Sequence, residues 1–444
     1  MSGLSQHLCA AVSRADLASR HGRLTAFNGL VIEAAGPEAH LGELCEVLPA
    51  HGAPIQAEVV GFRDNRVLLM PYGNVQGISA DSRIRATGRS LSIPVGAGLL
   101  GRVVDAFSQP LDGGPAIAYD ARYPLYREPI NPLDRAEIDE VLETGVRAID
   151  GLLTLGVGQR VGVLAGSGVG KSTLLGMLAK HVRADVTVMG LIGERGREVG
   201  DFLAHSLGAE GLKRSVVMVA TADQPALVRT HAVHAAHAVA EYFRDQGQSV
   251  LLIVDSMTRF AMAQREIGLA VGEPPTFRGY TPSVFGLLPK VLERCGRMRK
   301  GGAISAIYSV LVEGDDMNEP VTDHMRAILD GHIVLQRDLA ARGHHPAIDV
   351  LQSTSRLMSR VVPEKELAIA REVKRHLAVY EGSRDLVELG AHQRGANPAL
   401  DRALDIKPAL DQVLCQGASE HSRRSEAMSG LRAALEVQGG AHGA

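Results

Sequence analysis

The sequence predicts an α/β protein built around a parallel sheet, and two patterns along the chain support this prediction. Between about Val95 and Met358, short apolar runs such as QRVGVLAG, VTVMGLIG and SVLLIVDS alternate with longer helical patterns. This alternation is typical of βαβ units, whose helices cover both faces of a parallel sheet. One apolar run leads into a glycine-rich turn and a helical stretch, VLAGSGVGKSTLLGMLAK. Such a turn between a strand and a helix is typical of a phosphate-binding loop.

Segments of different character flank this region. The first residues carry an apolar stripe at helical spacing, which predicts an amphipathic helix, with a frayed terminal helix as the alternative. Short β-rich segments broken by turns follow, and these predict a small barrel or sandwich. The chain is mostly helical in pattern after Pro363. The predicted domains are residues 1–23, 24–94, 95–358 and 359–444.

Composition excludes several classes of protein. The chain has 444 residues, which predicts about three domains, and a net charge of −3. Only 4% of the residues are aromatic and none is Trp, so neither a basic surface nor stacking side chains indicate binding to nucleic acid. The four cysteines form no CxxC pair, and no apolar run approaches the roughly 18 residues of a membrane span. We therefore expect a soluble cytoplasmic protein with reduced thiols.

The glycine-rich turn has the residues that a triphosphate requires. Gly166, Gly168 and Gly170 allow successive N–H groups to converge on anionic oxygens, and the following helix adds its N-terminal dipole. Lys171 can reach the β- and γ-phosphates, and the hydroxyl of Ser172 can ligate Mg²⁺. We predict that a nucleoside triphosphate binds here. Its predicted contacts are Gly166, Ser167, Gly168, Val169, Gly170, Lys171, Ser172 and Thr173.

Two further apolar runs end in carboxylates that suit phosphoryl transfer. Asp255 follows SVLLIV and can hold the Mg²⁺ shell, usually through water. Glu194 follows VTVMGLIG and can orient the attacking water. The alternative is that Glu194, Arg195 and their charged neighbours form a solvated surface cluster, which sequence spacing alone leaves open.

Three histidines recur every three residues on one predicted helix. They are His231, His234 and His237, with Glu241 beyond them. A metal site is one interpretation of this spacing. The flanking alanines and the lack of distant ligands favour a solvated helix face instead.

Four long segments carry a family resemblance: AGSGVGKST, GLIGERGREVGDF, LLIVDSMTRFAMAQREIGLAVGEPPTFRGYTPSVF and HHPAIDVLQSTSR. Together they resemble the type III protein-export ATPases, which are relatives of the catalytic subunit of F-type rotary ATP synthases. The resemblance spans about Gly22 to Met358 and continues more weakly to about Gln416. It implies a β-barrel domain, a RecA-like nucleotide domain and a helical C-terminal domain, assembled as a homohexameric ring. The implied activity is Mg²⁺-dependent ATP hydrolysis coupled to protein export.

The resemblance also implies roles for individual residues. Lys171 and Ser172 match the residues that hold phosphate and Mg²⁺, and Glu194 matches the catalytic carboxylate. Arg195 is similar to the arginine beside the phosphates. Asp255 is similar to the carboxylate of the Mg²⁺ shell.

Three other positions concern the edges of the site. Arg356, in STSR, resembles the arginine finger that one subunit presents to the next subunit's nucleotide. His345 departs from the family, because the residue before Pro-Ala-Ile-Asp is usually a tyrosine that stacks on adenine, and imidazole covers less area. Ala165 stands where the phosphate-loop pattern usually begins with glycine, and alanine fits if its φ is negative.

The C-terminal region indicates the branch of the family. The rotary synthase subunit carries an acidic run where LVELGAHQRGANPALDRAL has only Glu388 and Asp401. This segment is more similar to the flagellar export ATPases than to the injectisome ATPases, where a Gly-Glu pair is more usual. We expect a flagellar export ATPase, with an injectisome ATPase as the alternative. An ATP synthase catalytic subunit, a non-catalytic scaffold subunit and a ring-shaped RNA motor like Rho are less favoured.

Partners and location follow from the same resemblance. It implies a regulatory or stator-like partner at the N-terminal helix, together with the export gate, a stalk protein and complexes of chaperone and substrate. No nucleic-acid partner is expected, and the arginines of residues 1–23 leave room for a peripheral membrane contact. The implied location is the cytoplasmic face of the export apparatus in the inner membrane.

Overall fold

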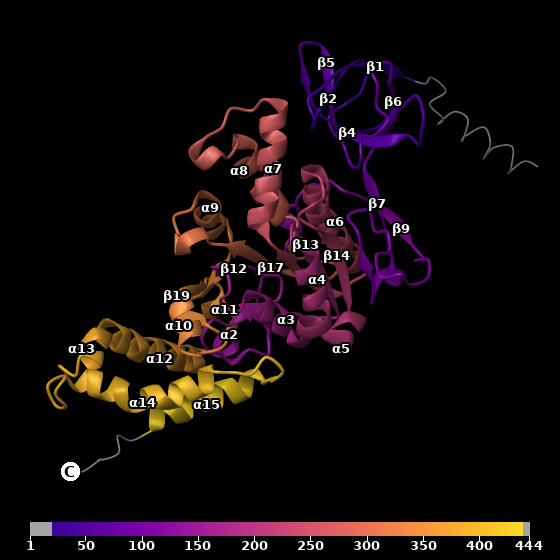
Figure 1. Ribbon diagram of the computed structural model, residues 1–444. Coiled ribbons are helices and arrows are strands. Elements are labelled where there is room, and N and C mark those ends of the chain that lie inside the picture. The colour runs from indigo at the N-terminus through magenta and orange to yellow at the C-terminus, as the bar shows by residue number, and fades with distance from the viewer. Residues whose placement is uncertain (1–19, 438–444) are drawn as a thin grey trace, which may run out of the picture.

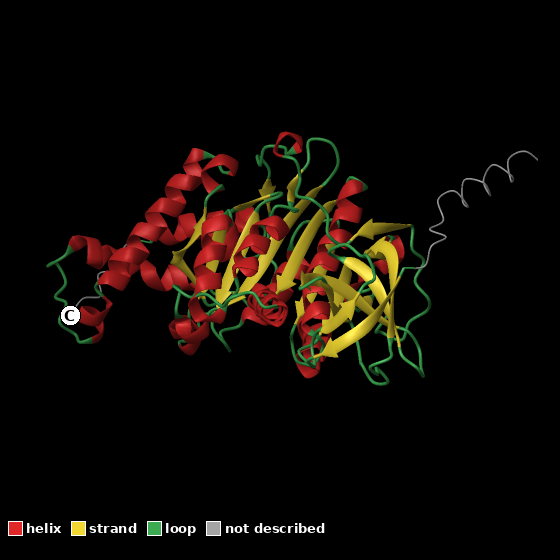
Figure 2. Ribbon diagram, turned by 90° about the horizontal axis from the view of Figure 1, so that it is seen from above, coloured by secondary structure: helices red, strands yellow, loops and turns green. Residues whose placement is uncertain are grey.

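The structure of the protein is a computed structural model that describes residues 20–437. In chain order these residues form a closed barrel, a large sheet covered by helices and a group of C-terminal helices (Figure 1). The barrel and the C-terminal helices lie at opposite ends, with the sheet between them (Figures 1 and 2). The predicted fold class is confirmed. Most of the N-terminal helix predicted over residues 1–23 lies outside the described residues, and that prediction is wrong for residues 21–23, which begin the barrel.

The barrel consists of six antiparallel strands in the order β1-β2-β5-β4-β3-β6. Along β3, buried residues such as Cys45 and Val47 alternate with partly exposed ones, as expected for a strand with one face on a core. Closure by pairing of β1 with β6 decides between the barrel and the sandwich that the sequence left open. The strands are β1 (His21–Phe27), β2 (Ile32–Ala35), β3 (Glu43–Leu48), β4 (Ile55–Arg63), β5 (Arg66–Pro71) and β6 (Arg83–Ser90).

A connecting region leads from the barrel to the large sheet. Here β7 pairs with β9, β10 pairs with β11, and β8 joins the edge of the large sheet beside β14. These elements are β7 (Ser92–Val95), η1 (Ala97–Leu99), β8 (Val103–Val104), β9 (Ala121–Pro124), η2 (Pro132–Asp134), β10 (Val141–Leu142), α2 (Arg147–Leu152) and β11 (Leu155–Gly156).

The large sheet has the strand order β19-β18-β12-β17-β15-β13-β14-β8, and β16 pairs with β17. All of its pairings are parallel except those of β16 and β19. The central strands are buried on both faces, which explains their continuous apolar runs. The strands not yet given are β12 (Arg160–Ala165), β13 (Val186–Ile192), β14 (Ser215–Ala220), β15 (Ser249–Asp255), β16 (Gly296–Arg297), β17 (Ala303–Leu311), β18 (Gly331–Leu335) and β19 (Ile348–Ser355).

Helices cover both faces of this sheet (Figure 2). Successive residues of β12 enter different cores: Val163 packs on the side of α3, and Leu164 packs on the side of α6 and α7. Helix α6 follows β14 and begins directly after Pro225. The helices are α3 (Lys171–His181), α4 (Gly196–Asp201), η3 (Phe202–Leu207), α5 (Gly208–Lys213), α6 (Ala226–Asp245), α7 (Met257–Val271), η4 (Phe277–Gly279), α8 (Pro282–Leu292), η5 (Glu313–Asp315), α9 (Pro320–Ile328), α10 (Arg337–Ala341) and α11 (Met358–Val361).

The C-terminal helices share the core on the α3 side. Leu367, Ile406 and Leu431 belong to the same apolar cluster as α3 and α2. The segment after α14 returns to the sheet domain, where the backbone N–H of Gln416 donates to the carbonyl of His345 at 2.7 Å. The helices are α12 (Glu364–Gly382), α13 (Arg384–Glu388), α14 (Pro398–Leu414) and α15 (Arg424–Glu436). Within residues 20–437, none of the helices has the length and apolar character needed to span a bilayer.

Candidate active site

The glycine-rich turn links the end of β12 to the start of α3. Gly168 and Gly170 have φ values of 79° and 92°, in the left-handed region where glycine is favoured over other residues. Ala165 remains in the strand, pairs with Leu311 and Leu335, and is not among the residues of positive φ, as its side chain requires. The turn therefore has the backbone shape expected of a phosphate-binding loop, and α3 begins at Lys171.

Lys171 meets two carboxylates at the carboxyl edge of the sheet. Its Nζ contacts Oδ1 of Asp255, at the end of β15, and lies 3.8 Å from Oε1 of Glu194, which follows β13. Asp255 also accepts a hydrogen bond of 2.5 Å from the hydroxyl of Ser309 on β17. The side chains of Lys171, Glu194 and Asp255 are only 14%, 12% and 5% exposed. The structure thus brings together three of the residues that the sequence singled out, and it excludes a solvated cluster at Glu194.

Glu194 is held in a particular electrostatic setting. Nη1 of Arg259, in the first turn of α7, lies 3.0 Å from Oε2 of Glu194 and also contacts the carbonyl of Gly193. Burial raises the pKa of Glu194 to about 7, with further contributions from a hydrogen bond to Glu198 and the charge of Asp255, against the lowering effect of Lys171 and Arg259. A carboxylate with a pKa near neutrality is suited to exchange a proton with water during hydrolysis.

Two oxygen ligands suit a magnesium ion at this place. Ser172 and Asp255 line one cavity of about 450 Å³, which also reaches Glu194. Hydroxyl and carboxylate oxygens are hard ligands of the kind that Mg²⁺ prefers, and Mg²⁺ usually completes its shell with water and substrate phosphates. Within residues 20–437 there is no cluster of three or more His, Cys, Asp or Glu that could hold a metal by itself. The donor set fits a metal carried mainly by the nucleotide.

A second cavity, of about 410 Å³, lies beside residues 168–170 of the phosphate loop. His345 borders it together with Thr173 and the loop glycines, and Gln416 lines it from the C-terminal domain. His345 is exposed, and its peptide bond to Pro346 is cis. His345 and the phosphate loop thus lie beside the same cavity, as expected for a residue near the nucleotide. Sequence reasoning did not find Gln416, whose approach depends on the packing of the C-terminal helices.

The two arginines predicted for the site, Arg195 and Arg356, do not contact the carboxylates of Glu194 or Asp255 within one chain. The side chain of Arg195 is 78% exposed and pairs with Glu198 at 3.6 Å. Arg356 is exposed, and its Nη2 donates to the carbonyl of Arg326 at 3.0 Å. Because Ser355 pairs with Gly331 at the amino end of β18, Arg356 lies at the edge of the sheet opposite to the phosphate loop.

The three histidines of α6 are buried, so the expectation of a solvated helix face is wrong. The helix lies between the sheet on one side and the barrel and α7 on the other. Nε2 of His231 lies 2.8 Å from both Oε2 of Glu58 and the hydroxyl of Tyr126. Nε2 of His237 lies 2.9 Å from the hydroxyl of Tyr308. These side chains therefore join the barrel and the sheet to α6.

Glu241, further along α6, forms a buried ion pair with Arg294, which follows α8. Glu241 accepts hydrogen bonds of 2.8 and 3.0 Å from Arg294, whose Nη1 also lies 3.3 Å from Nδ1 of His234. Burial, with the charge of Arg294, holds the pKa of His234 well below its usual value. A neutral imidazole in this environment serves packing and hydrogen bonding.

Comparisons with known proteins agree with this geometry. The barrel domain of the ATP synthase alpha/beta family matches residues 24–88, and the nucleotide-binding domain of the same family matches residues 145–355. The C-terminal domain of the T3SS EscN ATPase matches residues 362–433.

Individual relatives match over almost their whole length. The flagellum-specific ATP synthase of Bacillus subtilis is 50% identical over 96% of this chain and 98% of its own. The type 3 secretion system ATPase of Xanthomonas euvesicatoria is 47% identical over 91% of each chain. The assembled ATPase EscN from the type III secretion system of enteropathogenic E. coli covers 93% of this chain and all of its own, with 42% identity and a TM-score of 0.88. A second structure contains EscN in complex with its central stalk EscO and has a TM-score of 0.85.

Proposed function

This chain belongs to the ATP synthase alpha/beta family, among the ATPases of type III protein export, and we propose that it is the Mg²⁺-dependent ATPase of a flagellar export apparatus, working as a homohexamer. The observation that carries the catalytic part is the convergence of Lys171, Glu194 and Asp255 beside the phosphate loop. A scaffold subunit would not need the buried carboxylate of Glu194 at this place.

The proposed roles follow from the positions of the side chains. The loop N–H groups and Lys171 bind the β- and γ-phosphates, and Glu194 orients the attacking water and accepts its proton. Ser172 and Asp255 would hold Mg²⁺, which would neutralise phosphate charge and orient the nucleotide when bound. Arg259 fixes the carboxylate of Glu194 through the 3.0 Å contact.

Three residues extend the proposed site beyond this cluster. His345 lies beside the base of the nucleotide, in the cavity that it shares with Thr173 and Gln416. Arg356, which lies at the opposite edge of its own sheet, reaches the nucleotide of the next subunit in the ring. Arg195 contacts the phosphates only if it leaves its pairing with Glu198. Nucleotide binding and turnover therefore depend on the C-terminal domain beside His345, on the next subunit in the ring and on the pairing of Arg195 with Glu198.

Relatives support the assembly and the partners. EscN is assembled in one solved structure and bound to its central stalk in another, and we propose a ring and a stalk-like partner for this chain. Residues 1–23 are proposed to dock a regulatory partner, and the export gate and complexes of chaperone and substrate are further proposed partners. We place the enzyme at the cytoplasmic face of the inner membrane.

Flagellar export is favoured over an injectisome by the C-terminal sequence ELGAHQRGANPALDRAL. The relatives of this chain include flagellum-specific ATP synthases at 50% and 52% identity and a type 3 secretion system ATPase at 47% identity. This difference in identity is small, so the choice of a flagellar over an injectisome ATPase rests on the C-terminal segment.

A complementation experiment tests the proposal. The gene is deleted, and the strain is complemented with wild type or with Glu194→Gln. Swimming, flagellar filaments and effector secretion are scored in parallel. We expect deletion to abolish filaments and swimming, wild type to restore them and Glu194→Gln to fail. Loss of effector secretion with normal filaments would overturn the flagellar assignment in favour of the injectisome.

A further inference from the structure

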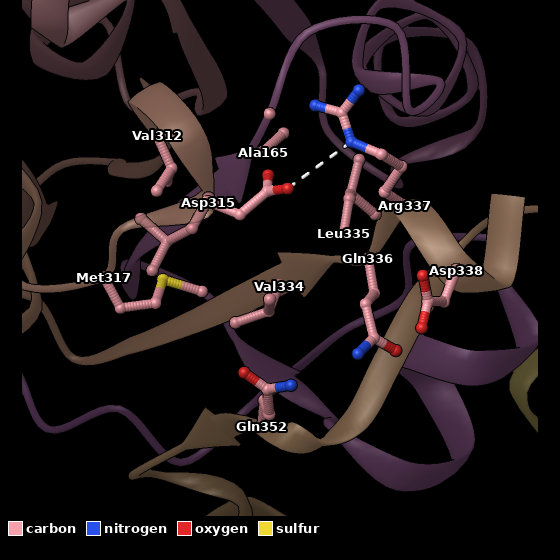
Figure 3. Close-up of a pocket in the computed structure, with 12 residues that line it drawn as sticks. Ala165, Val312, Asp315, Met317, Val334, Leu335, Gln336, Arg337, Asp338 and Gln352 are labelled. Atoms are coloured by element: carbon pink, nitrogen blue, oxygen red, sulfur yellow. Dashed lines mark hydrogen bonds and ion pairs between the residues drawn. The ribbon is translucent and has the colours of Figure 1, made fainter.

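A pair of oppositely charged side chains lies directly against the first glycine of the phosphate loop. A methyl group placed on Gly166 would lie 2.5 Å from Oδ1 of Asp315 and 3.2 Å from Nη2 of Arg337. Oδ2 of Asp315 and Nε of Arg337 are 3.4 Å apart (Figure 3). A side chain at position 166 would therefore displace the carboxylate of Asp315.

The sheet order explains how these groups meet. β12 lies between β17 and β18, so the loop after β12 lies between the loops that follow its two neighbours. Asp315 comes from the turn after β17, and Arg337 begins α10 after β18. Figure 3 shows the two side chains pointing toward one another across the end of β12, at Ala165.

The position of Asp315 is set by its backbone and its neighbour. Asp315 has a φ of 57° and follows Gly314 at 63°, so the turn is in the left-handed region at both residues. The next carboxylate, of Asp316, accepts a hydrogen bond of 2.7 Å from Arg278 in the loop after α7. The contact with Arg278 thus holds the residue next to Asp315, and Oδ1 of Asp315 faces Gly166.

A carboxylate at this place opposes the function of the loop. The loop gathers N–H groups and Lys171 to bind a triphosphate, and an unpaired negative charge beside it would repel that ligand. Arg337 neutralises the charge and lies against the loop itself. Both side chains are about half exposed, at 55% and 59%, and they border a cavity of about 230 Å³. Solvent therefore weakens the repulsion but does not remove it.

We propose that Arg337 is a positioning residue for ATP binding, because it pairs with Asp315 and keeps that carboxylate from repelling the phosphates at Gly166. The pair also links the turn at 313–318 to the phosphate loop, so a displacement of that turn changes the affinity for nucleotide. This inference rests on the proposed binding of ATP at the loop.

The charge test uses the full-length protein and four variants: Arg337→Ala, Arg337→Lys, Asp315→Asn and the double variant Arg337→Ala/Asp315→Asn. The dissociation constant of MgATP and the kcat and KM of hydrolysis are measured for each. We expect Arg337→Ala to weaken MgATP binding about fivefold, because it leaves one uncompensated charge at a partly exposed site. The kcat at saturation should change less than KM. Arg337→Lys and the double variant should bind nearly as well as wild type.

A purely structural role gives a different pattern. If the pair only stabilised the fold, Asp315→Asn would weaken binding as much as Arg337→Ala, and the double variant would be no better than either. That result, or normal MgATP binding by Arg337→Ala, would overturn the inference. Arg371→Ala is the matched control, since Arg371 and Glu364 form an exposed ion pair of 2.9 Å on α12, and it should leave MgATP binding unchanged.

A steric test uses the close approach of Gly166. Gly166→Ala should lower kcat/KM in wild type, and the loss should be smaller in an Asp315→Gly background. Glycine at 315 removes the carboxylate and suits the φ of 57°. Equal losses in the two backgrounds would contradict the contact.

Lys171→Ala separates this inference from the proposed function. If Lys171→Ala binds MgATP normally, the loop is not the nucleotide site and the proposed function itself fails. If Lys171→Ala loses binding while every Arg337 variant is normal, only the inference about the pair fails.

Discussion

The Nζ of Lys171 lies 3.8 Å from Oε1 of Glu194 and contacts the carboxylate of Asp255. Lys171 begins α3, Glu194 follows β13 and Asp255 ends β15. Lys171 and Asp255 are 84 positions apart in the chain. The ammonium group of Lys171 therefore faces both Glu194, which is proposed to orient the attacking water, and Asp255, which is proposed to hold Mg²⁺. The two carboxylates differ in their other partners, since Asp255 accepts from Ser309 and Glu194 is paired with Arg259. This difference is the basis of the separate roles tested below.

The first prediction separates binding from turnover. Glu194→Gln should bind MgATP with near-normal affinity, because amide and carboxylate have the same shape, but it should lose about 10²–10⁴-fold in kcat as the proton acceptor is removed. Lys171→Ala should lose both binding and turnover, because the ammonium group that binds the phosphates is removed. Nucleotide binding and steady-state hydrolysis are measured side by side. Near-normal hydrolysis by Glu194→Gln would refute its catalytic role.

Exposed Glu210 provides the control for this pair of variants. It lies on α5, where it pairs with Lys213 at 2.7 Å, and its side chain is 86% exposed. Glu210→Gln removes the same charge from the protein as Glu194→Gln. Its binding and turnover should match those of wild type.

The second prediction concerns pH. Burial raises the pKa of Glu194 to about 7, and the residue must be ionised to accept a proton. The value of kcat/KM should therefore rise with pH and reach half of its plateau near pH 7. Glu198→Ala should move this midpoint to lower pH, because the hydrogen bond with Glu198 favours the protonated form of Glu194. A midpoint that stays in place in Glu198→Ala would show that another group controls the acidic side of the profile.

The sequence was sufficient for the site residues that follow buried strands. Glu194 and Asp255 come at the ends of apolar runs, and Lys171 follows the glycine-rich turn after another. The carboxyl ends of parallel strands share one edge, so their meeting could be predicted. Ser309 and Arg259 were missed for different reasons. Ser309 lies inside a strand run, and only the pairing of β15 with β17 brings it to Asp255. Arg259 was visible within the DSMTRF motif, four residues after Asp255, but its contact with Glu194 depends on where α7 begins.

The burial of the histidines of α6 could not be predicted from the sequence of that helix alone. Their spacing places them on one face, but whether that face meets water depends on what packs against it. In the structure the barrel supplies Glu58 and Tyr72, and the connecting region supplies Tyr126. These partners lie more than 100 positions from His231, so no local pattern contains them. The closure of the barrel has the same cause, since β1 and β6 meet through residues such as His21 and Arg85.

The third prediction concerns His345. Its side chain borders the cavity beside Thr173 and the loop glycines, where an imidazole covers less of a base than a phenol would. His345→Tyr should bind ATP more tightly, by a few-fold, and discriminate more strongly among purine nucleotides. Affinities for ATP and GTP between pH 6 and 8 provide the measurement. Equal affinities of the two forms over this range would show that the side chain does not contact the base.

The last prediction tests whether the site is shared between subunits. Arg356 lies at the amino end of β18, whereas the phosphate loop follows the carboxyl end of β12, so the arginine cannot serve its own nucleotide. Arg356→Ala should bind MgATP and assemble, but lose about 10³–10⁵-fold in turnover, the typical contribution of an arginine finger. Mixing Arg356→Ala with Glu194→Gln should restore part of the activity, because some hybrid interfaces join an intact Glu194 to an intact Arg356. Wild-type specific activity should also rise with protein concentration as rings form. Specific activity that is constant across a range where sedimentation shows only monomers, together with no recovery on mixing, would exclude a shared site.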